Sequence, residues 1–80
     1  MKQAARHMTL TLLSRRSATA TVCPSEVARA MSPDGNWREM MPAVHAAVDD
    51  LVRDGVVELS WRRRALEERI GPYRIRKVAK

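Results

Sequence analysis

Apolar side chains recur at helical spacing along the first two thirds of this chain. Four of them between residues 37 and 54 lie three or four positions apart, so they share one helix face that must be buried. These four residues are Met41, Val44, Val48 and Leu51. Shorter runs with the same spacing predict two earlier helices, so three helices are expected, over about residues 4–15, 24–31 and 37–54.

Residues that begin and end helices stand at suitable places, with one exception. Pro24 suits the first position of the second helix, where its missing N–H leaves no hydrogen bond unmade. Asn36 and Glu39 form a capping-box pattern at the start of the third helix, and Gly55 supplies a left-handed stop at its end. Pro42 is the exception, because it removes a backbone hydrogen bond inside the helix. A kink or a break is therefore expected there.

After residue 56, apolar and polar residues alternate, which is the pattern of strands buried on one side. One strand is expected over residues 57–61 and a return strand near residues 73–76, joined by a charged tip from Arg62 to Gly71. The two strands should pair as an antiparallel hairpin over about residues 56–78 and pack against the third helix. Residues 78–80 are expected to fray.

The order of these elements predicts one α+β domain over residues 1–80 with a winged helix-turn-helix fold. The turn formers in Ser32–Asn36 separate a short helix from a longer one, which is the layout of a helix-turn-helix pair. A very short strand is expected at Thr21–Val22, which is β-branched. In the expected architecture, three helices pack against a small antiparallel β-hairpin whose tip forms the wing.

Aromatic side chains are few, since the chain has no Phe, two Trp and one Tyr. Trp37 and Trp61 are therefore expected to anchor the core rather than to serve as stacking platforms for bases. If the Trp61 indole is buried, its replacement by Ala should destabilise the domain by roughly 3–5 kcal/mol.

The net charge of +6 is confined to the end of the chain. Residues 1–60 carry seven basic and seven acidic side chains, whereas residues 61–80 carry eight basic and two acidic ones. A local basic patch on a balanced domain is the electrostatic pattern expected for a polyanion partner. The alternative is a solvated hairpin whose charges only aid solubility.

The residue types in the patch favour nucleic acid, because arginine binds phosphate through two parallel hydrogen bonds. The candidate DNA-binding residues of the hairpin are Arg62, Arg63, Arg64, Arg69, Arg74, Arg76 and Lys77. On the third helix only Arg38 is placed to contact a base edge, and no exposed Asn or Gln accompanies it. Residues 37–54 carry a net charge of −2, which disfavours close approach to phosphates. The expected function is binding of double-stranded DNA that is led by the wing, dominated by the backbone and weakly sequence-specific.

A different class of function is a protein-interaction or homodimer module without nucleic-acid binding. Met40, Ala43, Ala46 and Ala47 leave a smooth strip on the third helix that is suited to another helix. The alternative interpretation is that Met40 and Ala47 only widen the core face of that helix.

Catalytic and cofactor chemistry find little support in the chain. Cys23 has no base or orienting acid placed beside it by the sequence, and with His7 and His45 it has no metal-ligand spacing. The three glycines are isolated and form no phosphate loop. A non-enzymatic protein without metal or cofactor is expected. The single cysteine fits a reducing cytoplasm, and no stretch has the length of a membrane span.

Three stretches carry a resemblance to a known family. They are Cys23-Pro-Ser-Glu-Val-Ala-Arg-Ala30, Trp37-Arg-Glu-Met-Met-Pro-Ala-Val44 and the basic strand that follows Arg53-Asp-Gly-Val56. Over about residues 8–78 the chain resembles a family of small uncharacterised bacterial winged-helix proteins. The resemblance implies the fold and no activity, because the family is itself a domain of unknown function.

Overall fold

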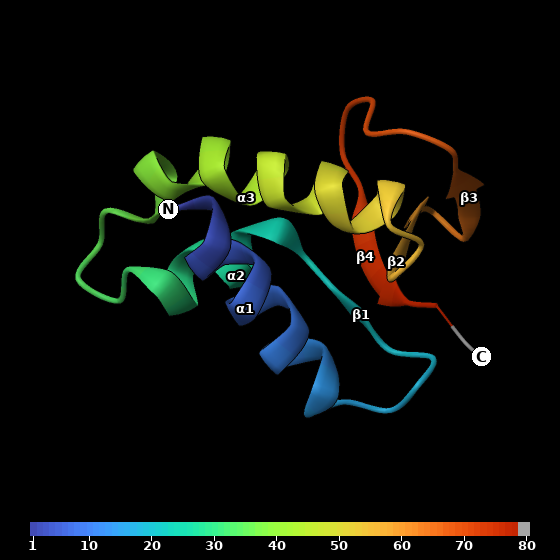
Figure 1. The fold of residues 1–80 in the computed structure, drawn as a ribbon, viewed down its shortest axis with the longest axis horizontal. Coiled ribbons are helices and arrows are strands. Elements are labelled where there is room, and N and C mark those ends of the chain that lie inside the picture. Colours follow the sequence, from blue (N-terminus) through green and yellow to red (C-terminus); the bar gives the residue numbers. More distant parts are fainter. Residues whose placement is uncertain (79–80) are drawn as a thin grey trace.

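The structure, a computed structural model, describes residues 1–78 and contains three α-helices and one four-stranded antiparallel sheet (Figure 1). The elements in chain order are α1 (Lys2–Ser14), β1 (Thr21–Val22), α2 (Pro24–Met31), α3 (Trp37–Arg53), β2 (Val57–Trp61), β3 (Arg64–Leu66) and β4 (Arg74–Lys77). The predicted α+β class is confirmed. The α2–α3 turn and strand β3 lie at opposite ends of the long axis, and α3 extends between them (Figure 1).

Helix α2 begins with a capping arrangement that the sequence analysis placed on α3. The Cys23 N–H donates to Glu26 Oε1 at 3.1 Å, while Pro24 occupies the first helical position, as predicted. At the start of α3 the Asn36 side chain makes no capping hydrogen bond, so the predicted capping box is wrong there. The Glu39 N–H is satisfied by the Asn36 main-chain carbonyl instead.

Helix α3 is continuous through Pro42, so the helix does not break at that residue. Pro42 is exposed, and Val44 and Val48 on the opposite face are fully buried, so the packed face holds the helix together where one hydrogen bond is missing. The stop at Gly55 is confirmed, with φ +73. The Gly55 N–H donates to the Val52 carbonyl, which satisfies one of the last carbonyls of the helix.

The sheet has the strand order β1–β4–β2–β3, with every neighbouring pair antiparallel. Ile75 lies at its centre, opposite Val22 on one side and Leu59 on the other. The predicted long charged tip is wrong in its first half, because Arg64–Leu66 forms β3 and pairs with β2. The turn between these strands consists of Arg62 and Arg63 alone. The sequence carries no Gly or Asn to signal so tight a turn.

The core lies between the three helices and the inner face of the sheet. Its buried apolar residues are Ala5, Leu13, Val22, Val27, Ala28, Val44, Ala47, Val48, Leu51, Val57, Leu59, Tyr73 and Ile75. Trp61 was expected among them but is 37% exposed, because it stands at the end of β2 beyond the helices. Trp37 is half-buried and packs against the core from outside. The aliphatic side chains of α3 and the sheet therefore take the place predicted for the indoles.

The end of the described chain is held by the sheet. The Val78 N–H donates to the Val56 carbonyl at 3.0 Å, so the prediction that Val78 frays is wrong. The rest of that prediction falls on residues 79–80, which lie outside the described residues. None of the helices in residues 1–78 combines the length and the apolar character that a membrane crossing requires.

Candidate functional site

The turn between β2 and β3 presents two arginines in an unusual backbone conformation. Arg62 has φ +52 and Arg63 has φ +69, and both side chains are exposed. The Arg62 guanidinium lies over the Trp61 ring, 5.8 Å from its centroid. Within residues 1–78, neither these two arginines nor the neighbouring Arg64 forms an ion pair with a carboxylate. We call Arg62 and Arg63 the turn arginines.

The strand register places two further candidate arginines on the sheet face that points away from the helices. Arg76 lies opposite Glu58, and Arg74 lies opposite Ser60, whereas the alternate residues of the same strands are buried in the core. Together with the turn arginines they line a groove of about 510 Å³, which we call the outer groove. Its lining consists of Thr19, Thr21, Glu58, Leu59, Ser60, Arg62, Arg63, Ala65, Arg74 and Arg76. Four arginines and one glutamate thus line the groove.

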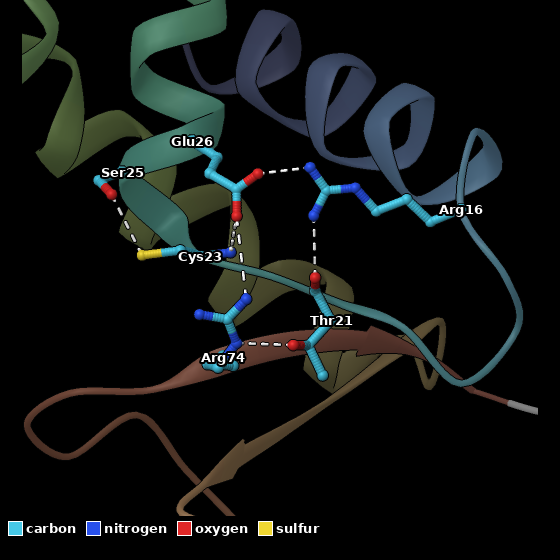
Figure 2. A network of polar contacts seen from close by, with 6 residues as sticks. All are labelled: Arg16, Thr21, Cys23, Ser25, Glu26 and Arg74. Carbon is cyan, nitrogen blue, oxygen red and sulfur yellow. Dashed lines mark hydrogen bonds and ion pairs between the residues drawn. The ribbon is translucent and has the colours of Figure 1, made fainter.

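Arg74 also belongs to a polar network that joins three parts of the chain (Figure 2). Its Nε donates to Thr21 Oγ1 at 2.6 Å, and its Nη2 lies 3.9 Å from Glu26 Oε1. Arg16 completes the network by pairing with Glu26 and by donating to the Thr21 carbonyl at 2.9 Å. The hydrogen bond from Arg16 is the main reason that the pKa of Glu26 lies below its ordinary value. The carboxylate therefore links the segment after α1, the start of α2 and strand β4.

Three of the eight predicted DNA-binding residues are engaged by carboxylates of the same chain. Arg69 donates from Nε and Nη2 to the two oxygens of Asp49 on α3, each at 3.1 Å. This bidentate contact raises the pKa of Arg69 and ties the loop before β4 to α3. Arg76 pairs with Glu58 across the strands, and Arg74 approaches Glu26. The predicted patch is thus partly neutralised, and Arg69 serves as a tether.

The acidic end of α3 is compensated as well, which the sequence analysis did not foresee. Asp49 accepts from Arg69, and the remaining two acids receive cations from α1: Lys2 pairs with Asp50 at 2.8 Å, and Arg6 reaches Asp54 at 3.5 Å. The contact from Lys2 is the main cause of a lowered pKa at Asp50. The net charge of −2 on this helix is therefore a poor guide to the field at its surface.

At the other end of α3, two guanidinium groups lie on one indole. Arg38 lies 4.4 Å and Arg29 lies 4.5 Å from the centroid of Trp37. Arg38 is exposed, as predicted, but it lies at the far end of α3 from the sheet. Lys77 lies opposite Val57, on the inner side of β4. The structure therefore brings together Arg62, Arg63, Arg74 and Arg76, and it places Arg38, Lys77 and Arg69 elsewhere.

Some residues that line the groove were not predicted from the sequence. Thr21 and Ser60 supply hydroxyl groups to its lining, but a lone Thr or Ser in a strand carries no signal without the register. Arg29 was not predicted because its relation to Trp37 crosses the α2–α3 turn. In the proposed docking strip on α3, Ala47 is fully buried and Met40 packs against the core, whereas Ala46 is exposed and Ala43 is half-buried.

His45 on α3 makes a polar contact with Tyr73, which lies just before β4. Its Nδ1 lies 2.6 Å from the hydroxyl oxygen of Tyr73, which is buried. Burial lowers the pKa of His45, the nearby Arg69 lowers it further, and Asp49 opposes this change. His45 Nδ1 and the Tyr73 hydroxyl group share this hydrogen bond, and burial raises the pKa of Tyr73.

This arrangement predicts that the domain loses stability in mild acid. Because the pKa of His45 is lower in the folded than in the unfolded state, the unfolded chain binds more protons below about pH 6.5. The free energy of unfolding should therefore be highest above pH 6.5 and fall as the pH drops toward 5. Urea titrations across this range test the prediction. H45Q should flatten the curve, whereas H7Q, at an exposed position on α1, should retain the fall; equal curves for H45Q and the parent would contradict it.

The comparison with known families agrees with the resemblance seen in the sequence. A family described as "Protein of unknown function (DUF3253)" matches residues 2–78, which is nearly the whole chain. No curated protein matches the chain.

Proposed function

The chain belongs to the DUF3253 family of proteins of unknown function, and we propose that it is a winged-helix protein that binds double-stranded DNA mainly through the phosphate backbone. The element order supports this fold assignment. A short strand between α1 and α2 pairs with the returning strand β4, while α2 and α3 form a helix-turn-helix pair. The β2–β3 hairpin then projects as the wing.

The single observation that carries the proposal is the conformation of the turn arginines. A two-residue hairpin turn with positive φ at both positions favours Asn-Gly, and a residue with a Cβ in the left-handed region costs roughly 1–2 kcal/mol. Arg62 and Arg63 occupy both positions. This turn gives up stability in order to carry two arginines at the tip of the hairpin. Strain of this kind is retained where the residues have a function.

The other DNA contacts are assigned to the predicted cations that form no ion pair within the protein. Among the predicted cations, Arg38, Arg62, Arg63, Arg64 and Lys77 have no carboxylate partner within residues 1–78. The turn arginines and Arg64 would grip phosphates. Arg38, steadied on Trp37 at the start of α3, would enter the major groove. With only one base contact, the protein discriminates weakly among sequences.

Binding should accordingly be steeply dependent on salt. If about five phosphates are engaged, log affinity should fall with log salt at a slope of roughly −4 to −5. Fluorescence anisotropy with labelled duplexes of random and of genomic sequence, at several salt concentrations, measures this slope and the discrimination together. Random and genomic duplexes should differ by less than about tenfold in affinity.

The control removes a cation elsewhere. Arg15 caps the end of α1, outside the proposed interface, and forms no ion pair within residues 1–78, so R15Q should change the slope little. A duplex that fails to bind at low salt, or a slope near zero, would contradict the proposed function. A strong preference for one genomic sequence would contradict the backbone-led mode of binding.

A further inference from the structure

The outer groove has the size of a small-ligand site and the chemistry of an anion site. Its volume of about 510 Å³ falls within the range of about 300–1,000 Å³ that is usual for small-molecule sites. A DNA duplex is too thick to enter it, so the groove floor is not used by the proposed DNA contact. The floor nevertheless carries Arg74 and Arg76, with the hydroxyl groups of Thr21 and Ser60 beside them.

The two floor arginines are held in place by bonds that leave donors unused. The Nε of Arg74 donates to Thr21 Oγ1 while its Nη2 lies 3.9 Å from Glu26 Oε1, and Arg76 donates from Nε and Nη2 to one oxygen of Glu58. Each guanidinium has five N–H donors in a fixed fork, so further Nη hydrogens remain for a ligand. Side chains that are already oriented lose little conformational entropy when they bind.

The number of guanidinium groups indicates how many phosphates the ligand carries. The turn arginines stand at one end of the β2–β3 hairpin, and the floor arginines stand on the neighbouring strand β4. Since guanidinium binds phosphate in pairs of hydrogen bonds, two pairs of arginines match two linked phosphate groups. No aromatic side chain lines the groove, so nothing there stacks on a base. The ligand is recognised through its phosphates.

We infer that the outer groove binds a small anion with a diphosphate group, and that this ligand competes with DNA for the turn arginines. The first part stands on the groove alone. The second part rests on the proposed function, because Arg62 and Arg63 line the groove and also form the proposed wing contact. A bound diphosphate would draw both guanidinium groups toward the groove and neutralise them, which makes it an inhibitor of DNA binding.

The test uses inorganic pyrophosphate and calorimetry. Pyrophosphate should bind with one-to-one stoichiometry and at least about tenfold more tightly than inorganic phosphate, since two phosphates engage both arginine pairs. S60E should abolish binding, because a carboxylate at position 60 lies opposite Arg74 and takes its donors. S60Q, of nearly equal size to S60E but uncharged, should retain saturable pyrophosphate binding, so that the loss in S60E is due to the added carboxylate. Circular dichroism checks that both variants are folded.

The competition is measured by DNA anisotropy. Pyrophosphate should displace DNA from the parent and from S60Q more strongly than sodium sulfate of equal ionic strength does, and this excess should vanish in S60E. Absence of saturable pyrophosphate binding, or binding that S60E leaves unchanged, overturns the groove site whatever DNA does. Pyrophosphate binding without excess displacement overturns the competition alone. Pyrophosphate binding by a protein that binds no DNA would refute the proposed function and leave the groove site standing.

Discussion

Replacing both turn arginines, as R62N/R63G, should weaken DNA binding by roughly 10- to 100-fold while it makes the protein more stable. Two charge-assisted phosphate contacts, each worth roughly 1 kcal/mol or more, are lost. At the same time Asn-Gly is the preferred sequence for a two-residue turn with positive φ at both positions, so the free energy of unfolding should rise by about 1–2 kcal/mol. Most substitutions that abolish binding do not also stabilise the protein.

Anisotropy and urea denaturation measure the two effects on the same samples. The salt slope should become shallower by about 2, because roughly 0.9 of slope is lost for each phosphate contact. R62K/R63K retains the charges in the strained turn, so it should keep most of the affinity and gain no stability. If R62N/R63G binds DNA as the parent does, the turn arginines are not the contact. If it is no more stable, the left-handed turn carries no strain.

Ile75→Ala should be among the most damaging substitutions in the protein, with a loss of about 2–5 kcal/mol of unfolding free energy. Ile75 is fully buried at the centre of the sheet, between Val22 on β1 and Leu59 on β2. Removing most of its side chain leaves a cavity where β1, β2 and β4 meet. For a domain of this size, each kcal/mol shifts the melting temperature by about 4–8 °C. Thermal denaturation followed by circular dichroism measures the loss.

Two companion variants locate the effect in the core. Ile75→Val, which removes one methyl group, should cost about 0.5–1.5 kcal/mol. Trp61→Ala removes far more atoms but should cost only roughly 1 kcal/mol, because the indole is 37% exposed and holds no central place in the core. A larger loss from Trp61→Ala than from Ile75→Ala would contradict this description of the core.

The hairpin illustrates why the sequence pattern alone did not predict every strand. Alternation of apolar and polar residues correctly indicated strands around Val57–Trp61 and Arg74–Lys77, since burial on one face imposes that pattern. Arg64–Leu66 has no such signature: Arg64 and Ala65 are exposed on opposite faces, and the segment is an edge strand with one neighbour. It forms a strand because β2 offers it unpaired backbone groups, and that is a tertiary cause.

In the candidate site, too, some features could be predicted from the sequence and others depend on tertiary contacts. The basic bias of the last twenty residues was evident from the sequence. Which of these arginines pair with carboxylates was not evident, because Asp49, Glu26 and Glu58 are separated along the chain from the arginines they bind. A charge acts on whatever lies within a few ångströms, so a count along the sequence cannot say which charges are cancelled.

The sequence by itself determined the α+β class, the helices, the left-handed stop at Gly55 and the accumulation of arginine near the end of the chain. These follow from periodicity, backbone preference and composition, which are properties of neighbouring residues. Only the tertiary structure decided that Trp61 leaves the core, that Arg69 becomes a tether, and that four arginines surround one groove. Each of these depends on strand register and on contacts between distant segments, and such contacts exist only once the chain has folded.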